Sequence, residues 1–175
     1  MKFEKVSKET FRLALVDSFI KPGKNEDKFE YSSSCIAEEI LDGIDLPKRS
    51  TVASAGYDFQ VPFDMVIHPG ETVIIPTGIK VKLDPDKVLM IAPRSSIGIK
   101  KRLKLANTQA YIDADYYNNP SNEGHILIAL TSENDHNVTL EHKDKIAQGI
   151  IIQYFTTEDD DCTDTRTGGI GSTGK

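Results

Sequence analysis

Two carboxylates in the middle of the chain, Asp113 and Asp115, stand two residues apart near the end of the stretch 107–116. In an extended strand such residues share a face, and the Tyr-Ile pair before them favours β-structure. A turn-forming run, 118–124, follows, and an apolar strand-like run occupies 124–131. The pattern predicts a β-hairpin that carries an Asn, two Asp and a Tyr near its tip. It is also typical of a solvated hairpin end whose Asp residues cap turns, so both interpretations stay open.

A second group of residues could bind phosphate. Arg94, Ser95 and Ser96 follow a strand-like run, 88–92, and precede a short run with helical character, 97–103. A guanidinium and two hydroxyls at a helix N-terminus can cradle a phosphate, because the free N–H groups and the helix dipole add to the positive charge. A capping serine and a surface arginine would have the same sequence.

The end of the chain is acidic at 158–161 and glycine-rich at 166–174. The glycine-rich part lacks the residue order of a nucleotide-binding P-loop, but its backbone N–H groups could close over a bound anion. It cannot bury a core of its own, so we expect a β domain over 1–155 and a flexible tail over 156–175.

Composition excludes several classes of function. The formal net charge of −6 argues against a general nucleic-acid or anionic-membrane binder, because no net positive field would attract phosphates. Cys35 and Cys162 have no metal-ligand spacing and predict no disulfide framework. No apolar run reaches about 18 residues and the start of the chain is charged. We therefore expect a soluble, cytoplasmic protein.

From residue 46 onward, short strand-like runs are separated by Pro, Gly, Asn and Asp. Such even spacing predicts an all-β barrel or double-sheet roll. Before it, 35–41 has the apolar spacing of a short helix, within a small mixed or helical insertion at about 12–45. The expected strands are 57–61, 65–67, 71–75, 78–83, 88–92, 103–108, 110–112, 124–131, 137–140 and 146–154.

Five stretches, taken in this order, resemble the five motifs of the trimeric dUTP diphosphatase (dUTPase) family: 55–58, 93–96, 107–116, 143–149 and 166–174. The resemblance covers 46–175. It implies a distorted β jelly roll that assembles as a homotrimer, with active sites at the subunit interfaces and a tail that closes a neighbour's site. The implied reaction is hydrolysis of dUTP to dUMP and pyrophosphate, which keeps uracil out of DNA and supplies dUMP.

The resemblance also implies roles for individual residues. Asp113 would be the general base that activates the attacking water. The Tyr116 ring would lie under the deoxyribose and reject a 2′-hydroxyl. Mg²⁺ would be held by the phosphates and by waters, with Asp58 touching it indirectly, and Asp144 would support the site. The remaining expected substrate contacts are Arg94, Ser95, Ser96 and Gln148 for phosphate, Asn107, Ala110, Tyr111 and Ile112 for uracil, and Arg166, Ile170, Gly171 and Ser172 in the closing tail.

Three features depart from the family pattern. Ile170 stands where a Phe usually stacks on uracil, which would weaken closure of the tail. Ala110 replaces the usual Gly of the uracil-reading segment, so the backbone there must suit an Ala. The segment 118–123 lengthens the turn after Tyr116.

Two other functions are weighed against hydrolysis of dUTP. A dCTP deaminase shares this fold but carries a catalytic Glu where this chain has Ala129, which disfavours deamination. A nucleotide-sensing protein with a regulatory protein partner is the alternative of a different class. The presence of Asp113 argues for turnover, because a sensor needs no base to activate water.

Overall fold

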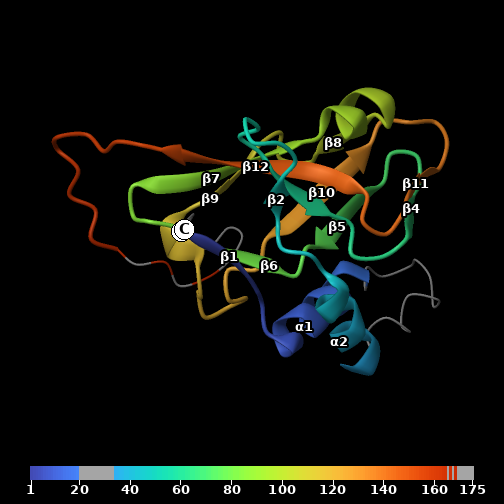
Figure 1. Cartoon of the computed structure of the whole chain (residues 1–175), viewed down its shortest axis with the longest axis horizontal. Helices are drawn as coiled ribbons and strands as arrows, with labels where there is room; N and C mark the ends of the chain where they lie inside the picture. The colour runs from blue at the N-terminus through green and yellow to red at the C-terminus, as the bar shows by residue number, and fades with distance from the viewer. Residues whose placement is uncertain (20–33, 165, 167, 169–175) are drawn as a thin grey trace.

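The computed structural model describes residues 1–19, 34–164, 166 and 168. Strands dominate this part of the chain, which confirms the all-β class predicted from the sequence. Figure 1 shows the strands stacked as a β body, with two helices together on one side of it and the last strand leading into the tail.

In the described part of the chain, the two helices come near the start, and the remaining elements are strands and two short helical turns. The elements are β1 (Lys2–Lys5), α1 (Lys8–Phe19), α2 (Ser34–Gly43), β2 (Lys48–Arg49), β3 (Tyr57–Gln60), β4 (Met65–Ile67), β5 (Thr72–Pro76), β6 (Ile79–Lys82), β7 (Lys87–Pro93), a π-helical turn η3 (Ser96–Lys100), β8 (Leu103–Leu105), β9 (Ala110–Ile112), a 3₁₀ turn η4 (Ala114–Tyr116), β10 (Leu127–Ser132), β11 (Val138–Leu140) and β12 (Lys145–Gln153).

The largest sheet has the order β2-β3-β12-β7-β9, and a second sheet has the order β5-β10-β8. Two smaller pairs, β1-β6 and β11-β4, complete the body. Burial alternates along β10 because one face meets the core, as a half-buried strand requires. Apolar side chains of both sheets, such as Leu89 and Ile91 on β7 and Ile128 and Leu130 on β10, form one contiguous core.

The predicted hairpin around the two carboxylates is wrong. Strand β9 pairs with β7, so that Ala110 lies opposite Ile91 and Ile112 opposite Leu89. Strand β10 pairs instead with β5 and β8. The chain leaves the strand after Ile112 and enters a 3₁₀ turn, so too few residues remain extended to reach β10. The long apolar strand β7 offers the edge that β9 occupies.

The N-terminal residues add two helices to the β body. The sequence predicted the second helix, confirmed as α2, but not α1 or β1. The fully buried residues of α1 are Phe11 and Leu15, which lie one helical turn apart. Its apolar stripe is therefore too narrow to predict a helix from the sequence. Phe11 and Leu15 form a second core with Ala37 and Leu41 of α2. The part of the expected insertion at 20–33 lies outside the described residues.

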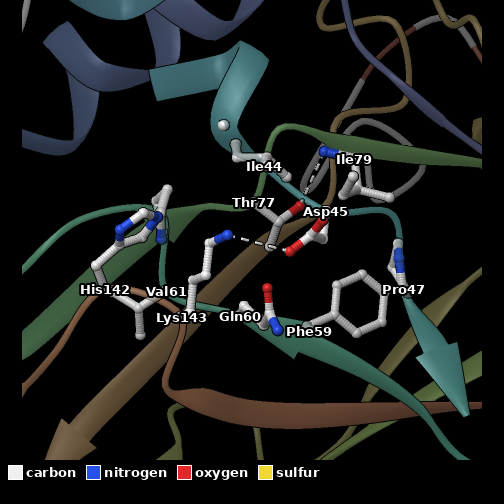
Figure 2. Close-up of a pocket in the computed structure, with 12 residues that line it drawn as sticks. Ile44, Asp45, Pro47, Phe59, Gln60, Val61, Thr77, Ile79, His142 and Lys143 are labelled. Carbon is white, nitrogen blue, oxygen red and sulfur yellow. Dashed lines mark hydrogen bonds and ion pairs between the residues drawn. The ribbon is translucent and has the colours of Figure 1, made fainter. Parts of the chain in front are cut away.

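Gly78 permits this helical layer to pack directly on the start of β6. Its φ is +71°, in the left-handed region that favours glycine. A Cβ there would lie 2.6 Å from the Ile44 Cδ1 atom and 3.0 Å from the Leu41 Cδ1 atom. Figure 2 shows the same junction, where the Lys143 ammonium lies 3.4 Å from Asp45. A cavity of about 10 Å³ remains there, which is room for roughly one water.

The loop after Tyr116, residues 117–124, closes onto α1 through Glu123. The Glu123 carboxylate accepts hydrogen bonds from the Ser7 hydroxyl at 2.5 Å, the Thr10 hydroxyl at 2.7 Å and the Lys80 ammonium at 3.2 Å. Burial opposes ionisation of Glu123, but these hydrogen bonds outweigh it and lower its pKa to about 2. A carboxylate at the start of α1 also suits the helix dipole.

We expect Glu123→Gln to lower the free energy of unfolding at pH 7 by about 1–3 kcal/mol, because the Ser7, Thr10 and Lys80 donors lose a charged acceptor. The folded pKa lies below the unfolded value of 4.5, so the contribution is complete above that value and is lost as the pH falls toward about 2. Urea unfolding at a series of pH values checks this, with the exposed Glu141→Gln as control. A difference from wild type that does not shrink between pH 4.5 and pH 2 would contradict the assignment.

Candidate active site

Asp58 lies at the centre of a charged group on the largest sheet. Its side chain is 4% exposed, and its two oxygens meet the Arg94 guanidinium at 2.5 Å and the Lys145 ammonium at 2.8 Å. The Ser50 hydroxyl donates to it at 2.6 Å. Burial opposes ionisation, but Lys145, Ser50 and Arg94 together lower the pKa of Asp58. The carboxylate is therefore ionised and holds Arg94 in place. No motif in the sequence pointed to Ser50.

Gln148 belongs to the same group. It lies opposite Asp58 in the pairing of β12 with β3. A Cβ on Gly56 would come within 2.5 Å of the Gln148 Oε1 atom, so the glycine leaves room for this side chain. Ser95 and Ser96 are exposed at the start of η3. This short π-helical turn replaces the longer helix expected at 97–103. A cation, an amide and two hydroxyls thus gather where the sequence predicted phosphate contacts.

A second group forms around the paired carboxylates. Arg166 donates to Asp113 at 2.7 Å and to Asp115 at 2.9 Å, and its guanidinium carbon lies 5.5 Å from the centre of the Tyr116 ring. The hydrogen bond from Arg166 to Asp115 raises the pKa of Arg166 above its usual value. The sequence predicted that the two carboxylates share the face of a strand, and this is wrong. Both reach Arg166 because the chain enters the η4 turn directly after Asp113, and Asp115 lies within that turn.

The residues predicted to read uracil lie next to this acidic group. Ala110, Tyr111 and Ile112 form β9, an edge strand of the largest sheet, and an edge strand presents unpaired backbone N–H and C=O groups. Ala110 is not among the residues with positive φ, so an Ala suits this position. Asn107 is exposed in the preceding turn, where Thr108 has φ +65°, a strained conformation for a β-branched residue.

The two groups occupy opposite ends of β7. Arg94 follows its last residue, Pro93. Asp113 follows Ile112, which pairs with Leu89 near the other end. Leu89 and Arg94 are five positions apart and Asp113 lies one position further, so at about 3.3 Å per residue the groups are roughly 20 Å apart along the strand. One protomer does not bring Arg94 to Asp113.

The other predicted site residues are placed as follows. The Asp144 carboxylate accepts from the Lys101 ammonium at 3.1 Å and from the Glu141 backbone N–H at 3.2 Å. It therefore braces the turn before β12. Ile170, Gly171 and Ser172 lie outside the described residues. Cys35 and Cys162 are both exposed and free.

Two larger cavities are present, the first beside the Asp58 cluster and the second beside α1. One of about 190 Å³ borders Asp58 and Lys145, and one of about 530 Å³ lies between α1 and the 121–125 region. Across the described ranges, no three His, Cys, Asp or Glu side chains are grouped so as to hold a metal ion, and no helix there is long and apolar enough to cross a membrane.

The fold and these two clusters of residues define a mostly β, jelly-roll-like protein. The arginine and hydroxyl group consists of Arg94, Ser95 and Ser96 at one end of β7, and the acidic group consists of Asp113 and Asp115 at the other. The chain belongs to the dUTPase family, whose model matches residues 42–174. The deoxyuridine 5′-triphosphate nucleotidohydrolase of Lactococcus lactis is 42% identical over 134 residues, which cover 75% of this chain and 89% of that protein.

Solved structures give the same result. A dUTPase from Streptococcus mutans is 40% identical and has a TM-score of 0.62, covering 69% of this chain and 91% of that one. A dUTPase from phage phi11 of S. aureus, 20% identical, has a TM-score of 0.58 over 69% of this chain and 91% of that one, and supports the fold alone.

We expect Asp58→Asn to lower the free energy of unfolding by about 1–3 kcal/mol, because it removes the charge that two cations share at a buried position. Urea unfolding measures this directly. The matched control is Glu133→Gln, because Glu133 and Lys104 form an exposed ion pair at 2.5 Å whose attraction is screened by solvent. Equal losses for the two variants would contradict the central position of Asp58.

Proposed function

We propose that the chain hydrolyses dUTP to dUMP and pyrophosphate by attack of an Asp113-activated water on the α-phosphorus. The observation that carries this proposal is that Asp113, Tyr116 and the edge of β9 lie together in a chain that matches the dUTPase family from 42 to 174. The cellular role would be to keep uracil out of DNA and to supply dUMP.

The acidic group would bind the nucleoside and activate the water. Asp113 has an exposed carboxylate directly after β9, so a water between it and the substrate can lose a proton to it. The free edge of β9 would pair with uracil, and a wrong base would leave buried polar groups unpaired. The Tyr116 ring would lie under the deoxyribose and exclude a 2′-hydroxyl.

The arginine and hydroxyl group would bind the phosphates. Asp58 holds the Arg94 guanidinium, and the Ser95 and Ser96 hydroxyls and the Gln148 amide add hydrogen-bond donors. A bound triphosphate would compete with the carboxylates for Arg166, which frees Asp113 to act as a base. The tail contacts expected at 170–172 would complete the closure.

A complete site would need more than one protomer. The distance of roughly 20 Å between Arg94 and Asp113 along β7 supports a site in which a second copy supplies one of them. Exposed apolar residues at the end of β12, Ile152, Tyr154 and Phe155, offer a surface for that copy. We therefore propose the homotrimer of the family, with each active site at a subunit interface and a tail extending from 156 to 175.

Magnesium fits this arrangement as a partner of the phosphates. Mg²⁺ keeps several waters and binds through one or two carboxylates and substrate phosphates, so it needs no all-protein cluster. Asp58, already held by Arg94 and Lys145, would contact its waters. When bound, the ion would neutralise phosphate charge and orient the α-phosphate. The phage phi11 relative is described as coordinating a structural Mg(II) ion.

This chain lacks the glutamate that a dCTP deaminase uses for catalysis. Ala129 lies on β10 opposite Ile74, so no carboxylate occupies the position where the deaminase carries its Glu. A nucleotide sensor with a regulatory partner would bind dUTP without turnover, and the experiment below separates it from the enzyme.

Incubation of the protein with dUTP, dCTP, UTP and dTTP in the presence of Mg²⁺ tests the proposal. We expect pyrophosphate from dUTP alone and no ammonia from dCTP. Asp113→Asn should lower kcat by about 10²–10⁴-fold, the usual contribution of a positioned base, while nucleotide still binds. Asp135→Asn, an exposed carboxylate beside His136, is the control. Wild-type turnover by Asp113→Asn would contradict its role, and binding of dUTP without any turnover would favour the sensor.

A further inference from the structure

The loop after Tyr116, residues 117–124, fixes the hydroxyl of that tyrosine inside the protein. The Asn122 side-chain amide donates to the Tyr116 hydroxyl at 2.8 Å. The hydroxyl in turn donates to the His125 main-chain carbonyl at 3.2 Å. Tyr116 is 7% exposed, and the Arg166 guanidinium lies over its ring. The hydroxyl end is therefore anchored while the ring meets the acidic group.

Asn122 is itself held on several sides. Its Oδ1 atom accepts from the Asn119 amide at 2.8 Å and from the Gly124 backbone N–H at 3.1 Å. The same Asn119 amide donates to the Tyr116 carbonyl at 2.8 Å, and Asn119 is 4% exposed. A buried polar network whose members are satisfied is rigid. Two asparagines thus hold the backbone and the hydroxyl of one tyrosine.

The loop also packs tightly against Tyr116. Gly124 has φ +79°, and a Cβ there would lie 2.5 Å from the Tyr116 carbonyl oxygen. Only glycine suits both conditions. Glu123, one residue earlier, joins the loop to Ser7 and Thr10 at the start of α1. The position of the loop is therefore set from two sides, by Tyr116 and by the N-terminal helix.

We propose that Asn122 is a specificity-determining positioning residue for hydrolysis of dUTP. Its amide holds the Tyr116 hydroxyl and thereby the ring that excludes a 2′-hydroxyl. Rejection of one extra oxygen requires a ring held within a fraction of an ångström, and a ring that can tilt admits ribose. The inference rests on the proposed role of Tyr116 as the residue that reads the sugar.

The test is the ratio of kcat/KM for dUTP to kcat/KM for UTP. We expect Asn122→Ala to lower this ratio by about three- to tenfold, the factor that corresponds to one ordinary hydrogen bond, through faster turnover of UTP. Ser121→Ala is the matched control, because Ser121 is an exposed neighbour in the same loop whose hydroxyl contacts Asn119 and not Tyr116. It should keep the wild-type ratio.

A double-mutant cycle shows whether Asn122 acts through the tyrosine hydroxyl. Tyr116→Phe should lower the ratio as Asn122→Ala does, and the two changes combined should lower it no further. Additive losses would show that Asn122 acts by another route and would overturn the proposal. Should Asn122→Ala fail to fold, Tyr116→Phe alone decides, because a wild-type ratio for that variant would show that the hydroxyl anchor is not needed.

Tyr116→Ala separates this proposal from the one on which it rests. If Tyr116→Ala leaves the ratio unchanged, the sugar is read elsewhere, and both the role of Tyr116 and that of Asn122 are overturned. If Tyr116→Ala lowers the ratio but Asn122→Ala does not, the role of Tyr116 stands and only the positioning role of Asn122 is overturned.

Discussion

The pairing of β7 with β12 on one edge and with β9 on the other determines where the proposed site residues lie. Gln148 pairs with Ala92 near the end of β7 that leads to Arg94. Ile112 pairs with Leu89 at the other end and delivers Asp113. The length of one strand therefore separates the cluster proposed to bind phosphate from the acidic cluster. The proposed site, which contains both, would join two copies of the chain, so strand register would link the fold to assembly.

Each group is then fixed by local electrostatics. Buried Asp58 lies between two cations and keeps Arg94 in one position. The exposed carboxylate Asp113 lies after an edge strand, where a water and a nucleobase can both reach it. Arg166 links the acidic group to the tail. Asp58 is buried and Asp113 is exposed, and this difference supports the proposal that the first has a structural role and the second a chemical one.

Local patterns in the sequence were sufficient for much of the β body. Strands 65–67 and 110–112 were predicted with the bounds that the structure shows, because turn residues flank short apolar runs. Pairing was harder to predict. The hairpin of 107–116 with 124–131 was wrong, since sequence proximity favoured it and the long apolar edge of β7 competed for β9. Helix α1 was missed because much of its surface is polar and its buried stripe is narrow. The hydrogen bonds of Asn122 depend on tertiary contacts that no local pattern encodes.

Recovery of activity by mixing two inactive variants would show directly whether one site draws on two protomers. Asp113→Asn and Arg94→Ala protomers are unfolded together, refolded and assayed with dUTP, after light scattering has established the same oligomeric mass for each variant alone. If each site takes Arg94 from one protomer and Asp113 from another, an equal mixture of trimers should regain about a quarter of the wild-type rate by random assortment. A mixture that assembles but stays as inactive as its components would contradict a site shared between two protomers.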